Sequence, residues 1–221
     1  MAGFGYNRDD LIRRGSAAGK PFRYEDEEEK ELPVKESEGD PLMLKFMKTR
    51  QILLSGEINK PLAERIIRQL LIMEADSSAP IQVFIDSPGG DADAGYAIVD
   101  MIRFISAPVF TIGMGLIASA GSLILLAAPR ERRLGLPDGR YLIHQPLSGI
   151  KGVATEIEIH AQELEKLRVK INRFISDETG KPIEQVQKDT DRDFWMNAEE
   201  ALDYGLISKV ISRRDELKKL L

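Results

Sequence analysis

Cysteine is absent from this sequence of 221 residues, and histidine occurs only twice. Without cysteine the chain can form neither disulfides nor thiolate metal sites, so its stability has to come from packing and from association with other chains. A reducing compartment fits this composition. With only two imidazoles, any chemistry that needs a histidine base has few candidates.

The sequence also lacks the charge patterns that mark nucleic-acid binding and secretion. Its formal net charge is −5, whereas phosphate binding needs clustered Lys and Arg, so nucleic acid is not expected as a partner. The first ten residues contain no basic region followed by an apolar stretch, which is the pattern of a secretory signal. We expect a cytoplasmic protein.

One long stretch lacks charge altogether. Phe104 to Pro129 holds 26 residues without Asp, Glu, Lys or Arg, about the length that spans a bilayer. Pro108 and several glycines and serines interrupt it. The pattern favours a strand at Val109–Ile112, then a turn, then an apolar helix at Ser122–Ala128. We therefore expect no membrane association.

The side chains that are present, 43% hydrophobic and 30% charged, can bury one sizeable core. Residues 1–40 differ from the rest, because seven Lys or Arg and eleven Asp or Glu give this segment −4 of the total charge of −5. Six of the seven positions from Glu25 to Glu31 are acidic, and their repulsion opposes compaction. We predict a flexible acidic arm over residues 1–40 and a single domain over residues 41–221.

Strands and helices are expected to alternate after Leu42. The strand segments, Gln51–Leu54 and Ile81–Ile85, are apolar almost throughout, as in a sheet that is covered on both faces. Helical patterns follow them at Pro61–Glu74 and Ala94–Ile105. This order indicates parallel β-α-β units and an α/β fold.

A long helix is predicted over residues 154–179. Thr155 and Glu158 have the spacing of a capping box at its start, and Gly180 with the following Pro182 ends it. Apolar residues recur between these points at helical spacing.

A second capping box, from Asn197 to Glu200, predicts a short helix that ends at Gly205. An apolar strand is expected after it, at Ile207–Ile211.

Two glycines follow one of the predicted strands in the sequence Asp86-Ser-Pro-Gly89-Gly90. Parallel sheets bind ligands at the carboxyl ends of their strands, and glycine lets a substrate backbone approach closely. Ser-Pro-Gly-Gly is equally the composition of an ordinary turn. Both interpretations stay open on this motif alone.

Ser119 lies between a predicted strand and the apolar helix that follows it. Unpaired N–H groups and the positive end of the helix dipole would favour an oxyanion that develops near its hydroxyl. A simple helix N-cap is the alternative interpretation.

A serine nucleophile needs a base, and the chain offers only His144 and His160. His144 ends a predicted strand and is the better candidate, while His160 is expected to be a surface residue of the long helix. Three carboxylates, of Asp189, Asp191 and Asp193, compete to orient the imidazole. Spacing does not choose among them.

Five segments in this order and spacing resemble the proteolytic subunit of the Clp protease: Ser-Pro-Gly89-Gly90, Ala-Ser119-Ala-Gly121, Ile-His144-Gln-Pro-Leu, Thr-Glu-Ile-Glu-Ile-His160-Ala and Asp-Thr-Asp-Arg-Asp193-Phe. The likeness extends from Leu42 to Arg213. It implies the α/β fold that Clp peptidases share with the crotonases, in which a handle of one strand and a long helix protrudes, here at about residues 147–179.

The resemblance implies a serine endopeptidase that needs no metal or other cofactor. Ser119 matches the nucleophile, His144 the general base and Asp193 the orienting carboxylate. The backbone N–H groups of Gly90 and Ala120 match the oxyanion hole. The substrate would bind as an added strand along positions that include Gly89, Ala92, Leu147 and Gly149.

The resemblance also implies an assembly. Family members form two stacked sevenfold rings through the handle, and Arg192 matches a residue that pairs with acids across the rings. A separate AAA+ ATPase unfolds protein substrates and threads them into the chamber. The pocket on which it docks matches Phe84, Phe104 and Ile211.

Several positions depart from the family pattern. Ala120 stands where Met is usual, which trims one wall of the pocket beside the nucleophile, and Asp86 stands where Asn is usual. Leu116-Ile117 replaces Gln-Ala. A rival interpretation is therefore a non-catalytic or partner-dependent subunit of a ring mixed with a paralogue. An acyl-coenzyme A hydratase or isomerase of the same fold class is a further alternative.

Overall fold

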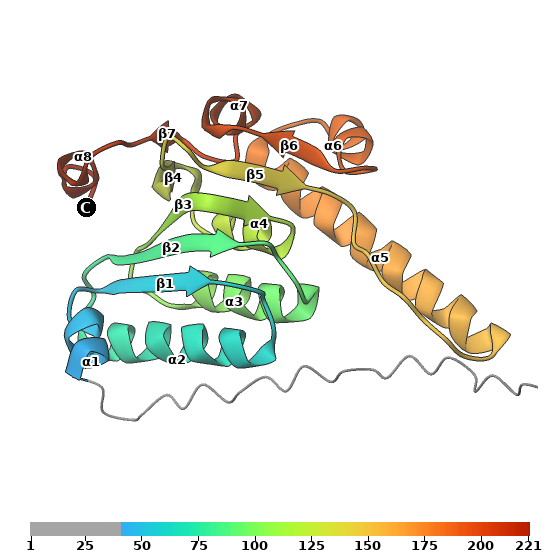
Figure 1. Cartoon of the computed structure of the whole chain (residues 1–221), viewed down its shortest axis with the longest axis horizontal. Coiled ribbons are helices and arrows are strands. Elements are labelled where there is room, and N and C mark those ends of the chain that lie inside the picture. The colour runs from blue at the N-terminus through green and yellow to red at the C-terminus, as the bar shows by residue number, and fades with distance from the viewer. Residues whose placement is uncertain (1–40) are drawn as a thin grey trace, which may run out of the picture. The chain divides into compact units, whose positions relative to one another are not determined.

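The computed structural model describes residues 41–221, and the expected acidic arm over residues 1–40 lies outside the described residues. A seven-stranded sheet forms the centre of this part (Figure 1). All strand pairs are parallel except β5 with β6. The strands are β1 (Gln51–Ser55), β2 (Ile81–Ser87), β3 (Val109–Ala118), β4 (Arg133–Gly135), β5 (Arg140–Ile143), β6 (Phe194–Met196) and β7 (Lys209–Val210). The α/β prediction is confirmed.

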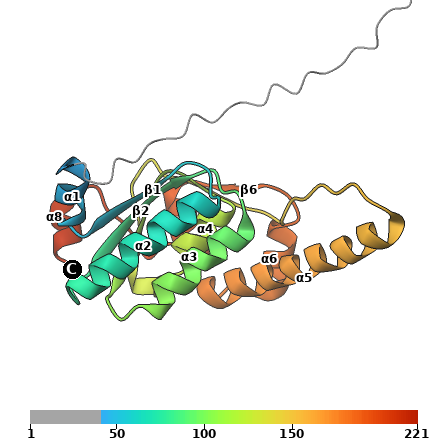
Figure 2. The same cartoon turned by 90° about the horizontal axis from the view of Figure 1, so that it is seen from below.

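The larger helices pack beside the sheet or project from it. Helices α2, α3 and α4 lie together along one face (Figures 1 and 2). The α-helices are α1 (Pro41–Met47), α2 (Lys60–Asp76), α3 (Ala92–Phe104), α4 (Ala120–Leu125), α5 (Ala154–Thr179), α6 (Ile183–Asp189), α7 (Ala198–Tyr204) and α8 (Arg214–Lys218).

Side-chain caps fix where α2 and α3 begin. Asn59 Oδ1 accepts a hydrogen bond from the N–H of Leu62 at 2.9 Å, and Asp91 Oδ1 accepts one from the N–H of Ala94 at 2.8 Å. These caps satisfy N–H groups that have no partner inside the helix. Each helix starts one or two residues earlier than apolar spacing predicts, because that spacing marks only the buried stripe.

Strand β3 is longer than expected, and the sheet forks along it. Its first half, at Thr111–Gly113, pairs with β4, while its second half, at Leu116–Ala118, pairs with β5. The uncharged stretch from Phe104 to Pro129 thus folds mainly as a buried strand and the short helix α4. No helix within residues 41–221 is long and apolar enough to cross a membrane.

The long helix α5 runs over residues 154–179, as predicted, and extends away from the sheet (Figure 1). Its N-cap was predicted wrongly: the chain enters the helix at Val153, and Glu156 Oε2 accepts a hydrogen bond from the Val153 N–H. Residues 147–153 before it form no strand, since no neighbouring strand pairs with them within the described residues.

A buried arginine ties the end of α5 to the sheet. Arg133 is 1% exposed, and its guanidinium donates to the carbonyl oxygens of Ala128 at 2.6 Å and Glu178 at 2.8 Å. It also forms an ion pair with the Glu178 carboxylate, which Arg103 contacts at 2.6 Å. Burial lowers the pKa of Arg133, and Glu178 opposes that shift.

The C-terminal elements agree in part with the sequence. In α7 the Asn197 and Glu200 side chains accept hydrogen bonds from each other's backbone N–H groups, which confirms the predicted capping box. Gly205 ends the helix with φ +94°. Strand β7 covers only Lys209–Val210, shorter than the apolar run that predicted it.

Candidate active site

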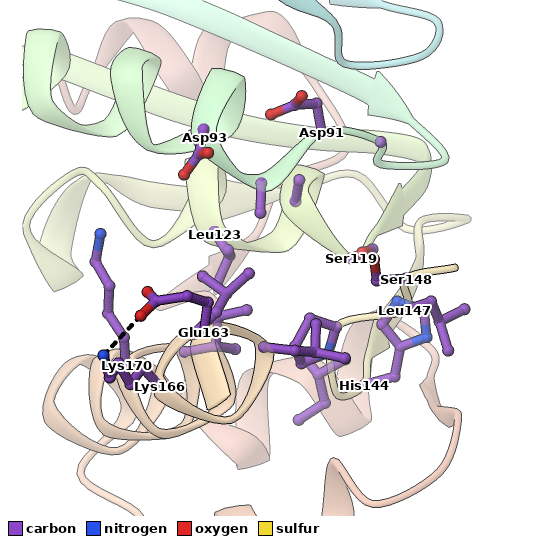
Figure 3. Close-up of a pocket in the computed structure, with 18 of the residues that line it drawn as sticks. Asp91, Asp93, Ser119, Leu123, His144, Leu147, Ser148, Glu163, Lys166 and Lys170 are labelled. Carbon is purple, nitrogen blue, oxygen red and sulfur yellow. Dashed lines mark hydrogen bonds and ion pairs between the residues drawn. The ribbon is translucent and has the colours of Figure 1, made fainter. Parts of the chain in front are cut away.

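The chemically interesting residues follow the carboxyl ends of three neighbouring strands. Gly89 and Gly90 follow β2, Ser119 follows β3 and His144 follows β5. Because β2, β3 and β5 are parallel neighbours, their ends meet at one edge of the sheet. Figure 3 shows Ser119 and His144 on the wall of one cavity at this edge.

Ser119 occupies a sharp turn between β3 and α4. Its φ of 55° and ψ of −121° lie in a region that non-glycine residues rarely adopt. The backbone is held there by a hydrogen bond from Ser119 N–H to Leu142 O at 2.9 Å, and Ser122 Oγ donates to the same oxygen. A strand-to-helix turn of this kind exposes a nucleophile. The strained backbone conformation persists because the surrounding hydrogen bonds hold it.

The two glycines are required by close packing. A Cβ on Gly90, whose φ is +141°, would lie 2.3 Å from the carbonyl oxygen of Ile58. Ile58 itself donates its N–H to Gly89 O at 2.7 Å and accepts the Asp91 N–H at 2.8 Å. No sequence pattern marked Ile58, because it lies in an irregular loop.

Two backbone N–H groups remain available at this edge. Within residues 41–221 neither Gly90 nor Ala120 donates its amide proton to another group. Ala120 is the first residue of α4, where helical N–H groups have no partner inside the helix. Such groups can stabilise a developing negative charge on a ligand oxygen.

The structure brings His144 and Asp193 together. His144 Nδ1 lies 3.0 Å from Asp193 Oδ1, and the two side chains are 15% and 60% exposed. The competing carboxylates are elsewhere: Asp189 accepts hydrogen bonds from Tyr204 Oη and Gln185 Nε2, and Asp191 contacts this region through its backbone oxygen. No hydrogen bond joins Ser119 Oγ to the imidazole within the described part of the chain.

A group of polar contacts holds the loop that carries Asp193. The Gln145 N–H donates to Thr190 O, and Gln145 Nε2 donates to Asp191 O, both at 2.6 Å. Thr190 Oγ1 donates to Asn172 Oδ1 at 2.8 Å, in the buried interior beneath the loop. Sequence analysis missed these residues, since each is an ordinary polar residue until the fold places them together.

A cavity of about 890 Å³ opens beside Ser119. Several residues that the resemblance selects line it: Gly90, Ala92, Ser119, Ala120, His144 and Leu147. Its remaining wall mixes apolar side chains, among them Leu123, Leu164 and Ile171, with charged ones, among them Asp93 and Lys170. The apolar part of this wall suits an apolar side chain.

His160 is partly exposed at the surface of the long helix, as expected. It also lines the same cavity, where its Nε2 lies 2.7 Å from Ser148 Oγ. Position 148 follows Leu147 in the irregular segment before α5, so the contact joins that segment to the helix.

Other selected residues lie away from the cavity wall. Gly89 is buried behind Ser119, and Gly149 and Arg192 are exposed. Phe84 packs against the apolar cluster that contains Ile211, whereas Phe104 is 79% exposed at the end of α3 and belongs to neither buried cluster. One copy of the chain therefore brings together only part of the expected docking pocket.

Comparison with known proteins agrees with this geometry. The family model described as Clp protease matches residues 35–214. The ATP-dependent Clp protease proteolytic subunit 2 of Treponema denticola is 65% identical over 86% of this chain and 96% of its own, and subunit 3 of Rhizobium etli is 44% identical over 87% and 97%.

A solved structure, that of a ClpP1 mutant from Listeria monocytogenes, is similar with a TM-score of 0.75 and 48% identity. The match covers 80% of this chain and 99% of that one. The family match and these likenesses extend over most of the chain, including all three strand ends described above. The chain therefore belongs to the Clp protease family, with the proteolytic subunits as its relatives.

Proposed function

We propose that the chain is a serine endopeptidase subunit in which Ser119, His144 and Asp193 act as a catalytic triad. The observation that carries this proposal is the 3.0 Å contact between His144 Nδ1 and Asp193, on the wall of the cavity that also holds Ser119. With Nδ1 engaged by a carboxylate, Nε2 is the nitrogen left to take the proton of Ser119.

The reaction would proceed through an acyl-enzyme. Ser119 Oγ attacks the peptide carbonyl carbon while His144 takes its proton, and the oxygen that becomes negative binds the N–H groups of Gly90 and Ala120. His144 then protonates the leaving amine. Water, deprotonated by His144, hydrolyses the ester and restores Ser119. Asp193 holds the imidazole and stabilises its charged form.

The substrate class we infer is unfolded polypeptide. An extended chain would run between Gly89–Ala92 and the segment that contains Leu147 and Gly149, bound mainly by main-chain hydrogen bonds. Leu147 is 82% exposed, and its segment has no strand partner in the described residues, so it is available for such pairing. The apolar part of the cavity wall would then bias cleavage toward apolar residues.

The assembly we infer is a pair of stacked sevenfold rings that join through the handle, residues 147–179. Exposed apolar side chains on the handle support burial against other copies: Leu147, Ile150, Val153, Ile157 and Ile159. Arg192 is exposed and suits an ion pair across the rings. A ring of this kind also has places for a paralogous subunit.

We infer that an AAA+ ATPase is the partner of this assembly. The relatives are named ATP-dependent, and folded proteins would have to be unfolded before they reach an enclosed site. Phe84, Phe104 and Ile211 form the docking positions, and the 79% exposure of Phe104 suits contact with a partner. We place this system in the cytoplasm, without nucleic-acid or membrane partners.

One observation favours the alternative of a subunit that depends on a partner for activity. Asp193 is 60% exposed, and Ser119 Oγ makes no hydrogen bond to His144 within residues 41–221. Contacts from another copy or from a paralogue would then be needed to cover Asp193 and to bring Ser119 Oγ into hydrogen-bond distance of His144. Mixing the chain with a paralogue and measuring peptide hydrolysis distinguishes this alternative.

A fluorophosphonate probe tests the proposal directly. The purified chain, Ser119→Ala and His144→Ala are treated with the probe, and adducts are located by peptide mass spectrometry. We expect one adduct, on Ser119, and none in either variant. An assembled wild type that remains unlabelled contradicts autonomous activity and favours the partner-dependent subunit.

A further inference from the structure

Strand β3 contains an irregularity just before the site, and Asp86 of β2 lies opposite it. Ile85 pairs with Gly113, but the next pair is Ser87 with Ile117. One residue of β2, Asp86, therefore spans three residues of β3, from Met114 to Leu116. Irregularities of this kind re-aim the strand that carries them and occur beside active sites.

The Asp86 side chain fills the irregularity. Its Oδ1 accepts a hydrogen bond from the Leu116 N–H at 3.0 Å, so it satisfies a backbone group that has left the regular ladder. Gly115 has φ +62°, and a Cβ there would lie 2.7 Å from the same oxygen. The Asp86 carboxylate thus occupies the space that a side chain at position 115 would need.

Asp86 is also connected to both segments that lead to the site, the one after β2 and the one after β3. Its backbone oxygen accepts the Gly56 N–H at 3.1 Å, and Ser87, the next residue, binds Gly56 O and the Gly89 N–H through its hydroxyl. On the other side, only Ile117 and Ala118 separate Leu116 from Ser119. The carboxylate is therefore a cross-strand link close to both Gly90 and Ala120.

We propose that Asp86 is a positioning residue, whose carboxylate fixes the spacing between the Gly90 and Ala120 N–H groups. The proposal rests on the function inferred above, in which those two groups bind the oxyanion. Asp86 does not touch the substrate. It acts by holding β3 against β2. If a donor is displaced, the binding of the tetrahedral species weakens more than the binding of the ground state.

The test compares Asp86→Ala, Asp86→Asn and, as a remote control on α3, Asp100→Ala in the full chain. Each is titrated with an N-blocked peptide aldehyde that ends in leucine and with the matching peptide alcohol. The aldehyde forms a tetrahedral adduct with Ser119 whose oxygen occupies the hole, while the alcohol reports ground-state binding. Hydrogen exchange of residues 113–119 and the melting temperature are measured in parallel.

We expect Asp86→Ala to bind the aldehyde at least about tenfold more weakly, with alcohol affinity within about threefold of wild type. Asp86→Asn keeps an oxygen that can accept the Leu116 N–H, so both affinities should stay close to wild type. Exchange over residues 113–119 should be faster in Asp86→Ala only.

Three results would overturn the proposal: unchanged aldehyde affinity in Asp86→Ala, a parallel loss for both ligands, or an Asp86→Asn variant as weak as Asp86→Ala. A wild type that forms no aldehyde adduct would contradict the proposed peptidase function instead. Hydrogen exchange of residues 113–119 would then test the role of Asp86 without any ligand. Equal exchange rates in wild type and Asp86→Ala would show that Asp86 does not hold β3 against β2.

Discussion

Gly89 packs so closely behind Ser119 that a Cβ on the glycine would lie 2.6 Å from the Cβ of the serine. The same atom would lie 2.8 Å from the backbone oxygen of Ala118, and the φ of Gly89 is +95°. Gly89 thus leaves the room that the Ser119 turn occupies, in addition to any role in substrate binding.

Gly89→Ala should therefore disable the site. The added methyl group has to displace the Ser119 turn, and the backbone conformation adds about 1–2 kcal/mol of strain. We expect the rate of fluorophosphonate labelling to fall at least about a hundredfold, since small displacements of reacting groups have effects of this size. Gly149→Ala is the control, because a Cβ there meets nothing within 4 Å. Equal labelling of the two variants would contradict this reading of Gly89.

Asp193→Asn should lower kcat for a peptide substrate by about 10³- to 10⁴-fold, because the amide does not fix the required tautomer of His144. Asp191→Asn is the matched control two residues earlier, where the contact to Gln145 is made by the backbone. Steady-state kinetics of both variants make the measurement. If Asp191→Asn lost as much activity as Asp193→Asn, the assignment of the third triad member would be wrong.

Glu178→Gln should destabilise the fold by about 3 kcal/mol, because it leaves the buried Arg133 guanidinium without its counter-charge. Urea unfolding followed by fluorescence of the single tryptophan, Trp195, measures this. The control is Glu163→Gln, whose ion pair with Lys166 is exposed and should contribute below about 1 kcal/mol. Similar losses in the two variants would argue against a structural role for the buried pair.

Tyr96 should make the fold sensitive to alkaline pH. Its buried hydroxyl has no hydrogen-bond partner within residues 41–221, and burial raises the pKa of Tyr96 to about 12 from its ordinary value of 10.0. Above pH 10 the unfolded chain releases this proton while the folded chain retains it, so stability falls from about pH 10 to pH 12.

Tyr96→Phe removes that contribution. We expect the variant to lie within about 1 kcal/mol of wild type at pH 7 and to lose less stability than wild type between pH 7 and pH 11, as measured by urea unfolding. Part of the alkaline loss should persist, because burial also raises the pKa of Tyr141 and Tyr204. Identical losses in variant and wild type would show that Tyr96 titrates normally in the fold.

The sequence predicted the elements whose causes are local. The long helix over residues 154–179 follows from its periodicity and from Gly180 at its end, and the box from Asn197 to Glu200 follows from capping chemistry within a few residues. Paired glycines after an apolar strand marked one side of the site for the same reason. The family resemblance then supplied roles that spacing could not.

The remaining features depend on residues far apart in the chain. Asp193 is 49 positions from His144, and the antiparallel pairing of β5 with β6 brings them together. The extension of β3 beyond Ile112 requires an irregularity filled by Asp86, which no periodicity records. The contact of His160 with Ser148 was not predicted, because Ser148 lies in a segment without regular structure.

The fork in the sheet places the three proposed triad residues on one branch, while β2 pairs with both halves of β3. Ser119 follows β3, His144 follows β5 and Asp193 precedes β6, so hydrogen-bonded neighbours carry all three. Gly90 comes instead from the end of β2, where its neighbour is the loop at Ile58. Mutations around β1 and α2 should thus reach the chemistry through Gly90, whereas mutations around β6 and α6 should reach it through the imidazole. Inherited variation in the two halves of the chain would then alter two different kinetic properties of one enzyme.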